Sequence, residues 1–206
     1  MRDMTTGIRS SALALLFAGL AWAASTTDGL RLVPNESRME LTVEKTGLLS
    51  GKKHLFTFRD FEGRFDSDQS QPEHSTIALS IATTSIQCED KWLSAADLNK
   101  VQQYALKDML AVARFPRILF QSGAIRKTAA GYEVRGTLTI REKAKPVTLN
   151  VSVRTGSNGS TVLEGTSRFR LTDFGLKPPS AALGTIGTKD EILFHFVLAT
   201  VEQANR

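Results

Sequence analysis

Residues 133–141 read Glu-Val-Arg-Gly-Thr-Leu-Thr-Ile-Arg, and their side chains alternate between polar and apolar, with Gly136 in an apolar position. Successive side chains of a β-strand point to opposite faces, so this alternation predicts a strand with one buried and one solvent-facing side. The same period is found in residues 38–44, 76–81, 147–153 and 168–172, and further candidate strands are residues 54–59, 61–65, 118–125, 162–164 and 192–200. Half-buried strands usually pair antiparallel. We therefore expect an all-β barrel or sandwich of about eight to ten strands, with a tight hairpin at Asn158-Gly159.

One stretch departs from this period and predicts an α-helix near residues 94–110. Ser94 is the expected N-cap because Asp97 follows three positions later. Apolar residues then return at helical spacing, at Leu98, Val101, Ala105 and Met109. A single helix among strands is expected to cover one end of a barrel or to pack on its flank.

Residues 1–23 have the pattern of a secretory signal peptide. Arg2 and Arg9 precede an uncharged apolar run over residues 12–22, and Ala21-Trp22-Ala23 is an A-x-A cleavage signal. The run is shorter than the ~20 residues that span a bilayer, and an uncleaved N-terminal anchor is the alternative. We expect residues 24–206 to form one mature domain that is periplasmic or secreted.

The composition narrows the classes of protein to consider. The chain has 206 residues and a net charge of +5, with 41% hydrophobic and 23% charged residues, as is typical of a globular protein. One Cys and three His allow neither an intrachain disulfide nor a Cys-rich zinc site. The basic residues are spread out and not interleaved with aromatics, so no nucleic-acid partner is expected. A weak, transient contact with an anionic membrane surface fits this charge.

No motif predicts catalysis or a metal site. The loop over residues 47–53 contains glycines and lysines, but it lacks the spacing and the Ser or Thr of a phosphate-binding loop. His74 is predicted to be exposed, and His195 lies between two Phe residues, so it points to the opposite face of its strand from both. Cys88 is followed by two acidic residues, and nearby carboxylates raise the pKa of a thiol. We therefore interpret Cys88 as a small half-buried side chain or as half of an intermolecular disulfide. We expect the protein not to be an enzyme, and the rival hypothesis is a hydrolytic or peroxide-handling enzyme that uses His54 or Cys88.

The apolar side of the strands predicts a dry interior, because Phe, which has no polar handle, occurs 11 times against 2 Trp and 2 Tyr. The residues predicted to line the barrel are Met39, Leu41, Phe56, Phe58, Phe61, Phe65, Ile77, Leu79, Ile81, Ile118, Phe120, Leu138, Ile140, Leu149, Phe169, Leu171, Phe194 and Phe196. An eight-stranded barrel is either filled by side chains or holds one ligand. Gly63, Gly136 and Gly165 fall on the apolar side of their strands, where they open space for a long apolar guest or mark bulges.

Six short elements occur in a fixed order along the mature chain. They are PNES at 34–37, FEGRF at 61–65, SI at 85–86, FPRILFQS at 115–122, GTLTIR at 136–141 with KPV at 145–147, and TDFG at 172–175. Together they resemble the YceI-like family of secreted, lipocalin-like polyisoprenoid-binding proteins. The resemblance implies a lipocalin-like extended antiparallel β-barrel of about eight strands. The chain departs from the family at Glu142, where a glycine is usual, and in residues 45–58 and 178–188, which are longer than in the commonest form.

The same resemblance implies a non-catalytic protein that binds and sequesters or carries a long amphiphilic isoprenoid lipid, of polyprenyl or quinone type. Lys52 and His54 are predicted to contact its head group, and no cofactor is expected apart from such a lipid or quinone. The alternative is a filled barrel that acts as a protein-interaction or structural module in the cell envelope. The oligomeric state, including a dimer, stays open.

Overall fold

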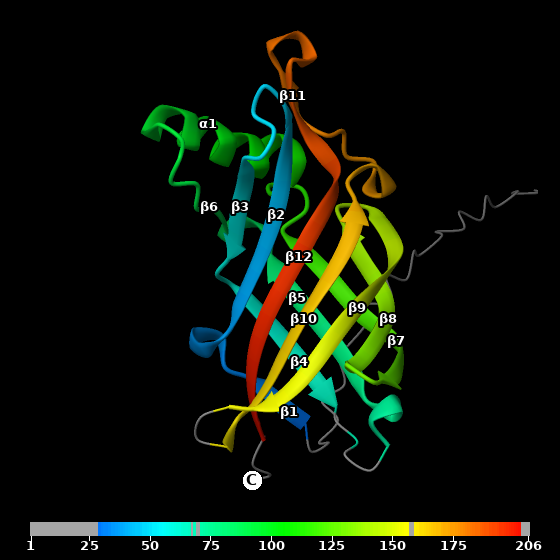
Figure 1. Ribbon diagram of the computed structural model, residues 1–206. Helices are drawn as coiled ribbons and strands as arrows, with labels where there is room; N and C mark the ends of the chain where they lie inside the picture. Colours follow the sequence, from blue (N-terminus) through cyan, green and yellow to red (C-terminus); the bar gives the residue numbers. More distant parts are fainter. Residues whose placement is uncertain (1–28, 67, 69–70, 157–158, 203–206) are drawn as a thin grey trace, which may run out of the picture.

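The computed structural model describes residues 29–202 apart from 67, 69–70 and 157–158, so the predicted signal peptide lies outside the described residues. Eight strands close an antiparallel barrel in which β12 returns to β1 (Figure 1). In order around the barrel they are β1 (Gly29–Leu32), β4 (Phe61–Asp66), β5 (Thr76–Ala82), β7 (Arg117–Thr128), β8 (Gly131–Ile140), β9 (Lys143–Thr155), β10 (Thr161–Arg170) and β12 (Ile186–Glu202). The expected all-β, lipocalin-like barrel with one inserted helix is confirmed.

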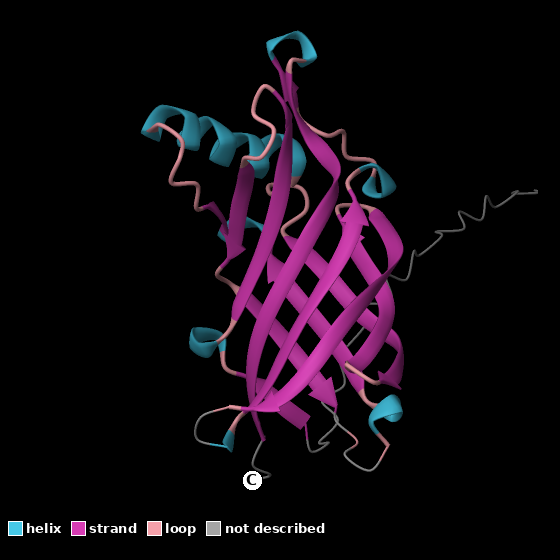
Figure 2. Cartoon of the chain, viewed as in Figure 1, coloured by secondary structure: helices cyan, strands magenta, loops and turns pink. Residues whose placement is uncertain are grey.

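The barrel wall extends beyond the closed ring at one end. Residues 186–197 of β12 pair with β2 (Arg38–Gly47), whereas residues 200–202 pair with β1. β3 (Lys53–Phe58) pairs with β2, and the short β6 (Ile86–Cys88) pairs with β3. β11 (Ser180–Ala181) pairs with the beginning of β12. Figure 2 shows that this extended wall and the helix lie at the same end of the barrel.

The helix α1 (Ala95–Tyr104) covers the end of the barrel opposite to β1 and the C-terminus (Figure 1). Its predicted N-cap is confirmed, since the Asp97 N–H donates to Ser94 Oγ at 3.2 Å. The helix continues as a π-helical turn, Ala105–Met109. Within the described residues, no helix is both long and apolar enough to cross a membrane.

The side chain of Gln102 attaches α1 to the free edge of β6. Its Oε1 accepts a hydrogen bond from the Cys88 N–H at 2.8 Å, and its Nε2 donates to the Ile86 carbonyl at 2.8 Å. An edge strand has backbone groups without a neighbouring strand, and buried backbone groups must be paired. The Gln102 amide therefore takes the place of a neighbouring strand at this edge.

The predicted strands are present, with three differences. The candidates at 162–164 and 168–172 are parts of one strand, β10, and Leu171 lies after its end, before the 3-10 helix Thr172–Phe174. β1, β6 and β11 were not predicted, because two to four residues are too few to show a period. The predicted tight hairpin at Asn158-Gly159 lies partly outside the described residues, and what the structure describes there is the antiparallel pairing of β9 with β10, which reaches Thr155 and Thr161.

The space opposite the inward glycines is occupied by phenylalanine rings. A Cβ added to Gly165 would lie 2.5 Å from Phe196 Cζ, far inside contact distance. Equivalent Cβ atoms would lie 2.6 Å from a ring atom at Gly136 and 2.8 Å from one at Gly63. The prediction that these glycines open space for a guest is therefore wrong. The three rings, which we call the phenylalanine layer, are Phe65, Phe120 and Phe196.

We expect Gly165→Ala to destabilise the barrel. The new methyl group would overlap both the Phe196 ring and the Asn150 carbonyl oxygen, which is 2.7 Å away, and overpacking of this kind costs about 1–3 kcal/mol. Gly123→Ala is the matched control, because the atom nearest to its added Cβ, the Arg135 carbonyl oxygen, is 3.8 Å away. Urea unfolding of both variants measures the difference. Equal midpoints for the two variants would contradict the close packing of the phenylalanine layer.

Candidate functional site

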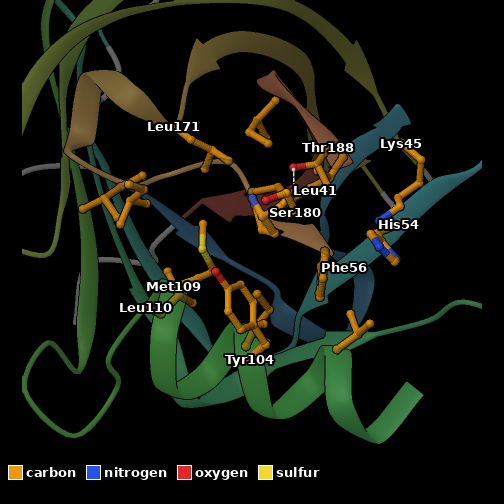
Figure 3. A pocket seen from close by; sticks show the side chains of 18 of the residues that line it. Leu41, Lys45, His54, Phe56, Tyr104, Met109, Leu110, Leu171, Ser180 and Thr188 are labelled. Carbon is orange, nitrogen blue, oxygen red and sulfur yellow. Dashed lines mark hydrogen bonds between the residues drawn. The ribbon is translucent and has the colours of Figure 1, made fainter. Parts of the chain in front are cut away.

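A mainly apolar space lies between the barrel and α1, and we call it the upper cavity. Its volume is about 370 Å³, within the range of ~300–1,000 Å³ that is usual for small-molecule sites. Figure 3 shows Tyr104, Met109 and Leu110 on the helical segment, facing Leu41 and Leu171 on the barrel side. The upper cavity is thus a space closed on one side by the helix.

Few polar groups border the upper cavity. The polar side chains of a wall that is otherwise mainly apolar are those of Lys45, His54, Lys100, Tyr104, Ser180 and Thr188, most of which are labelled in Figure 3. Burial lowers the pKa of the Lys45 ammonium group, and the negative charge of Asp90 offsets part of this shift. An apolar space with a small number of convergent polar groups is typical of a site for an amphiphilic molecule.

A narrow space of about 50 Å³ lies further inside the barrel, and we call it the middle cavity. It shares five wall residues with the upper cavity, which are Leu41, Phe58, Ile118, Ile140 and Phe169. A lower cavity of about 420 Å³ lies toward the other end of the barrel and shares no wall residue with either. Phe120 and Phe196 border the middle cavity and Phe65 borders the lower one, so the phenylalanine layer lies where these two spaces approach each other.

The structure places the remaining predicted lining residues in four groups. Phe56 and Leu171 border the upper cavity alone. Leu79, Ile81, Leu138, Leu149 and Phe194 border the middle cavity, as do Phe120 and Phe196. Ile77 borders the lower cavity together with Phe65. Met39 and Phe61 border none of these three cavities and are buried in the packed part of the interior. The barrel is therefore partly open and partly filled.

Several wall residues of the upper cavity were not predicted from the strand pattern. They come from α1 and its π-helical turn, from β6 and from the segment after β10, and they include Ile86, Val101, Tyr104, Leu110 and Leu176. The helical spacing of Val101, Ala105 and Met109 did identify an apolar helix face. That spacing did not reveal which strands the face would meet.

The two predicted head-group residues have different surroundings. Lys52 is exposed and borders none of the three cavities, and its Nζ lies 5.8 Å from the centre of the Trp92 ring. His54 is buried in the wall of the upper cavity, where its Nδ1 bonds Asp90 Oδ2 and its ring stacks on Trp92 with centroids 5.5 Å apart. Of the two residues, only His54 is therefore placed to contact a molecule in the upper cavity.

Cys88 lies beside His54 because β6 pairs with β3. Its side chain is buried, with 4% of the residue exposed, so the interpretation as half of an intermolecular disulfide does not fit. Desolvation raises the pKa of the Cys88 thiol to about 12, with a smaller contribution from the charge of Asp90. A Cys, a His and an Asp in contact are also the groups of a nucleophilic enzyme. A catalytic Cys needs a lowered pKa, however, and this thiol is held in its protonated form.

The other two histidines lie away from this group. His74 is exposed in the 3-10 helix Pro72–His74. His195 Nε2 lies 3.3 Å from Glu164 Oε1 and its Nδ1 lies 3.6 Å from Glu40 Oε2. It is thus on the opposite face from Phe194 and Phe196, as predicted, and it contributes to none of the cavities described here.

Similarity to known proteins agrees with this architecture. A UPF0312 protein of Pseudomonas putida (strain W619) is 32% identical over 142 residues, which cover 63% of this chain and 67% of that protein. A UPF0312 protein of Pseudomonas savastanoi pv. phaseolicola is 29% identical over 185 residues, which cover 84% and 87%.

Two solved structures share the fold. The crystal structure of Burkholderia cenocepacia BcnA matches with a TM-score of 0.66 at 22% identity, covering 82% of this chain and 99% of that one. A Campylobacter jejuni YceI protein matches with a TM-score of 0.53 at 18% identity, covering 73% and 85%. Residues 30–198 match the YceI-like domain, from the first strand of the barrel into the last. The chain therefore belongs to the YceI-like domain family.

Proposed function

We propose that this protein binds and sequesters or carries a long amphiphilic isoprenoid lipid, of polyprenyl or quinone type, without changing it chemically. The family and the fold are those of a barrel-type binding protein. The observation that carries the proposal is the mainly apolar upper cavity, which shares one wall with the middle cavity. Binding without turnover agrees with the protonated, buried state of the Cys88 thiol.

In this proposal the apolar chain enters first and extends toward the phenylalanine layer. Each buried CH₂ contributes about 0.8 kcal/mol, and affinities rarely exceed about 18–21 kcal/mol. Burial of part of a long chain is therefore sufficient for tight binding. The head group then lies near Lys45, Ser180 and Thr188, with Lys45 as the donor to a carbonyl or phosphate oxygen. Lys45 replaces Lys52 in this role, because Lys52 lies outside the cavity wall.

Organic extraction followed by mass spectrometry tests the proposal directly. We expect the mature chain, purified without detergent from its native compartment, to carry a prenyl lipid or quinone in a stoichiometric amount. A blank extract that stays blank after incubation with isoprenoid alcohols and quinones would contradict it. That result would favour the alternative of a barrel that acts as a protein-interaction module.

A charge on the cavity wall should weaken binding of such a lipid. Val101 is half-buried on α1 and borders the upper cavity, so Val101→Glu places a carboxylate against the apolar chain. We expect affinity for a fluorescent isoprenoid to fall at least tenfold, because burying an unpaired charge costs more than 1.4 kcal/mol. Gln103→Glu adds the same charge at an exposed position of the same helix and should bind normally. Equal loss in both variants would place the binding site elsewhere.

We propose that the protein is exported, with residues 1–23 removed. Cleavage after Ala23 would leave Ala24 as the first residue. Intact-mass measurement on protein from the periplasm or the medium, with N-terminal sequencing, is expected to find that end. A full-length chain recovered from the membrane fraction would instead support the uncleaved anchor.

We also propose that the protein contacts an anionic membrane surface with the end that carries the upper cavity. Leu48, in the turn between β2 and β3, is 79% exposed, and Leu183, in the turn between β11 and β12, is fully exposed. The two turns are adjacent, since the Leu48 N–H donates to the Thr185 carbonyl at 3.0 Å. Exposed Lys52 and Lys189 lie close to these turns in the sequence.

Removing both leucines should weaken this contact. The double variant Leu48→Ser with Leu183→Ser is expected to bind vesicles of phosphatidylglycerol and phosphatidylcholine about tenfold less well, because each leucine contributes roughly 1.5–3 kcal/mol when fully buried and only part of that at an interface. Leu119→Ser is the control, since Leu119 is 47% exposed on the barrel wall, away from these turns. Vesicle sedimentation measures the difference. The contact is refuted if the double variant sediments as the unchanged protein does.

A further inference from the structure

Three side chains with different donor atoms meet beside the upper cavity. His54, Cys88 and Asp90 are all buried, and one nitrogen, the thiol sulfur and one carboxylate oxygen all lie within 4.8 Å of one another. His54 Nδ1 bonds Asp90 Oδ2 directly. The described part of the chain contains no other group of three such residues close enough to hold an ion.

The pairing of β3 with β6 explains why these side chains share one place. Phe56 pairs with Cys88, and the Glu89 N–H donates to the Leu55 carbonyl at 2.8 Å, so the antiparallel pairing continues beyond the end of β6. His54 and Asp90 each lie two residues further along their strands. Side chains two residues apart lie on the same face of a strand, which puts all three donors on one face of this sheet edge.

Neighbouring groups hold the donors in position. The second carboxylate oxygen of Asp90 accepts the Leu55 N–H at 2.8 Å. The backbone N–H of Cys88 is fixed by Gln102 of α1, and the His54 ring is stacked on Trp92. Trp92 is itself anchored, because its Nε1 donates to the Lys53 carbonyl at 3.0 Å. Such outer contacts orient the ligands of a metal site.

We propose that His54, Cys88 and Asp90 bind a divalent transition-metal ion, with zinc as the best fit. Zinc takes nitrogen, sulfur and carboxylate ligands at bond lengths of about 2.0–2.3 Å, which places the donors of a tetrahedral site about 3.3–3.8 Å apart. The three donor atoms, which all lie within 4.8 Å of one another, are close to that spacing. Three protein ligands leave one coordination position for water or for a polar group of a molecule in the upper cavity, whose wall includes His54.

The charges of the group favour a dication. A thiolate, a carboxylate and a neutral imidazole carry two negative charges, which a divalent ion neutralises in a buried place where a net charge is costly. Binding breaks the S–H bond and releases the Cys88 proton to solvent while the S–metal bond forms. Two further charged groups act on the site from outside it. Lys45 interacts electrostatically with Asp90, and Glu89 interacts electrostatically with Cys88. The charges of Lys45 and Glu89 have opposite signs and offset each other.

Cobalt substitution tests the site, because Co²⁺ bound to a thiolate gives a charge-transfer band in the near ultraviolet. Cys88 is the only cysteine of the chain, so such a band in a protein without an affinity tag identifies the site without any variant. We expect the band to saturate at one equivalent of Co²⁺ and to disappear when Zn²⁺ is added. Competition with a chromophoric chelator then gives the affinity for Zn²⁺.

Variants of the three donors should each weaken Zn²⁺ binding at least tenfold. Cys88→Ser, His54→Gln and Asp90→Asn remove one donor at a time, and circular dichroism checks that each variant folds. His74→Gln is the matched control, since His74 is exposed and its neighbours Pro72 and Ser75 border the lower cavity, and this variant should bind as the unchanged protein does. Absence of the cobalt band from folded protein would overturn the proposal. Unchanged Zn²⁺ affinity in Cys88→Ser would overturn it too, because the ion would then lie elsewhere.

Discussion

The structure depends on the long strand β12, one edge of which pairs with two different strands. β12 pairs along one edge with β10, while its other edge is shared between β2 over residues 186–197 and β1 over residues 200–202. The backbone of Ala199 bridges the change of partner, since its carbonyl accepts the Val33 N–H at 2.8 Å and its N–H donates to Ser37 Oγ at 3.0 Å. The lower part of the wall therefore closes through β1, and the upper part continues through β2, β3 and β6. A ring closed by β1 throughout would leave no extended wall for α1 to cover.

The extended wall creates an edge that needs a partner, and α1 supplies it. The free backbone groups of β6 bond the Gln102 side chain, so the helix is held across the barrel end by two hydrogen bonds and by its apolar face. The Arg141 side chain, in the tight turn between β8 and β9, donates to the Asp108 carbonyl at the far end of the helical segment. A helix that lies across a barrel end fills it less completely than strand side chains fill the barrel interior. The upper cavity is the space that remains.

Packing inside the barrel shows why a pattern in one strand cannot predict the volume of the interior. The alternation in residues 133–141 correctly places Gly136 on the inner side, yet the space above it is taken by Phe120 of the neighbouring strand. The same holds for Gly165 and Phe196, which pair directly across β10 and β12. A glycine leaves space beside its own strand, and an aromatic ring from the neighbouring strand fills that space. Which ring fills it depends on the register between the two strands, which the sequence of one strand does not give.

The sequence alone determined the positions of the longer strands, the buried face of each, the helix with its Ser94 cap, and the resemblance to the YceI-like family, which the comparisons bear out. These features follow from local periods of two and 3.6 residues and from short motifs, which need no knowledge of the rest of the chain. Only the tertiary structure decided that His54 is buried against Cys88 and Asp90, that α1 forms one wall of the upper cavity, and that three phenylalanine rings fill the middle of the barrel. His54 and Asp90 are 36 residues apart and meet only because β3 and β6 pair in one register. Contacts of this kind arise from the pairing of strands that are distant in the sequence, which local patterns do not specify.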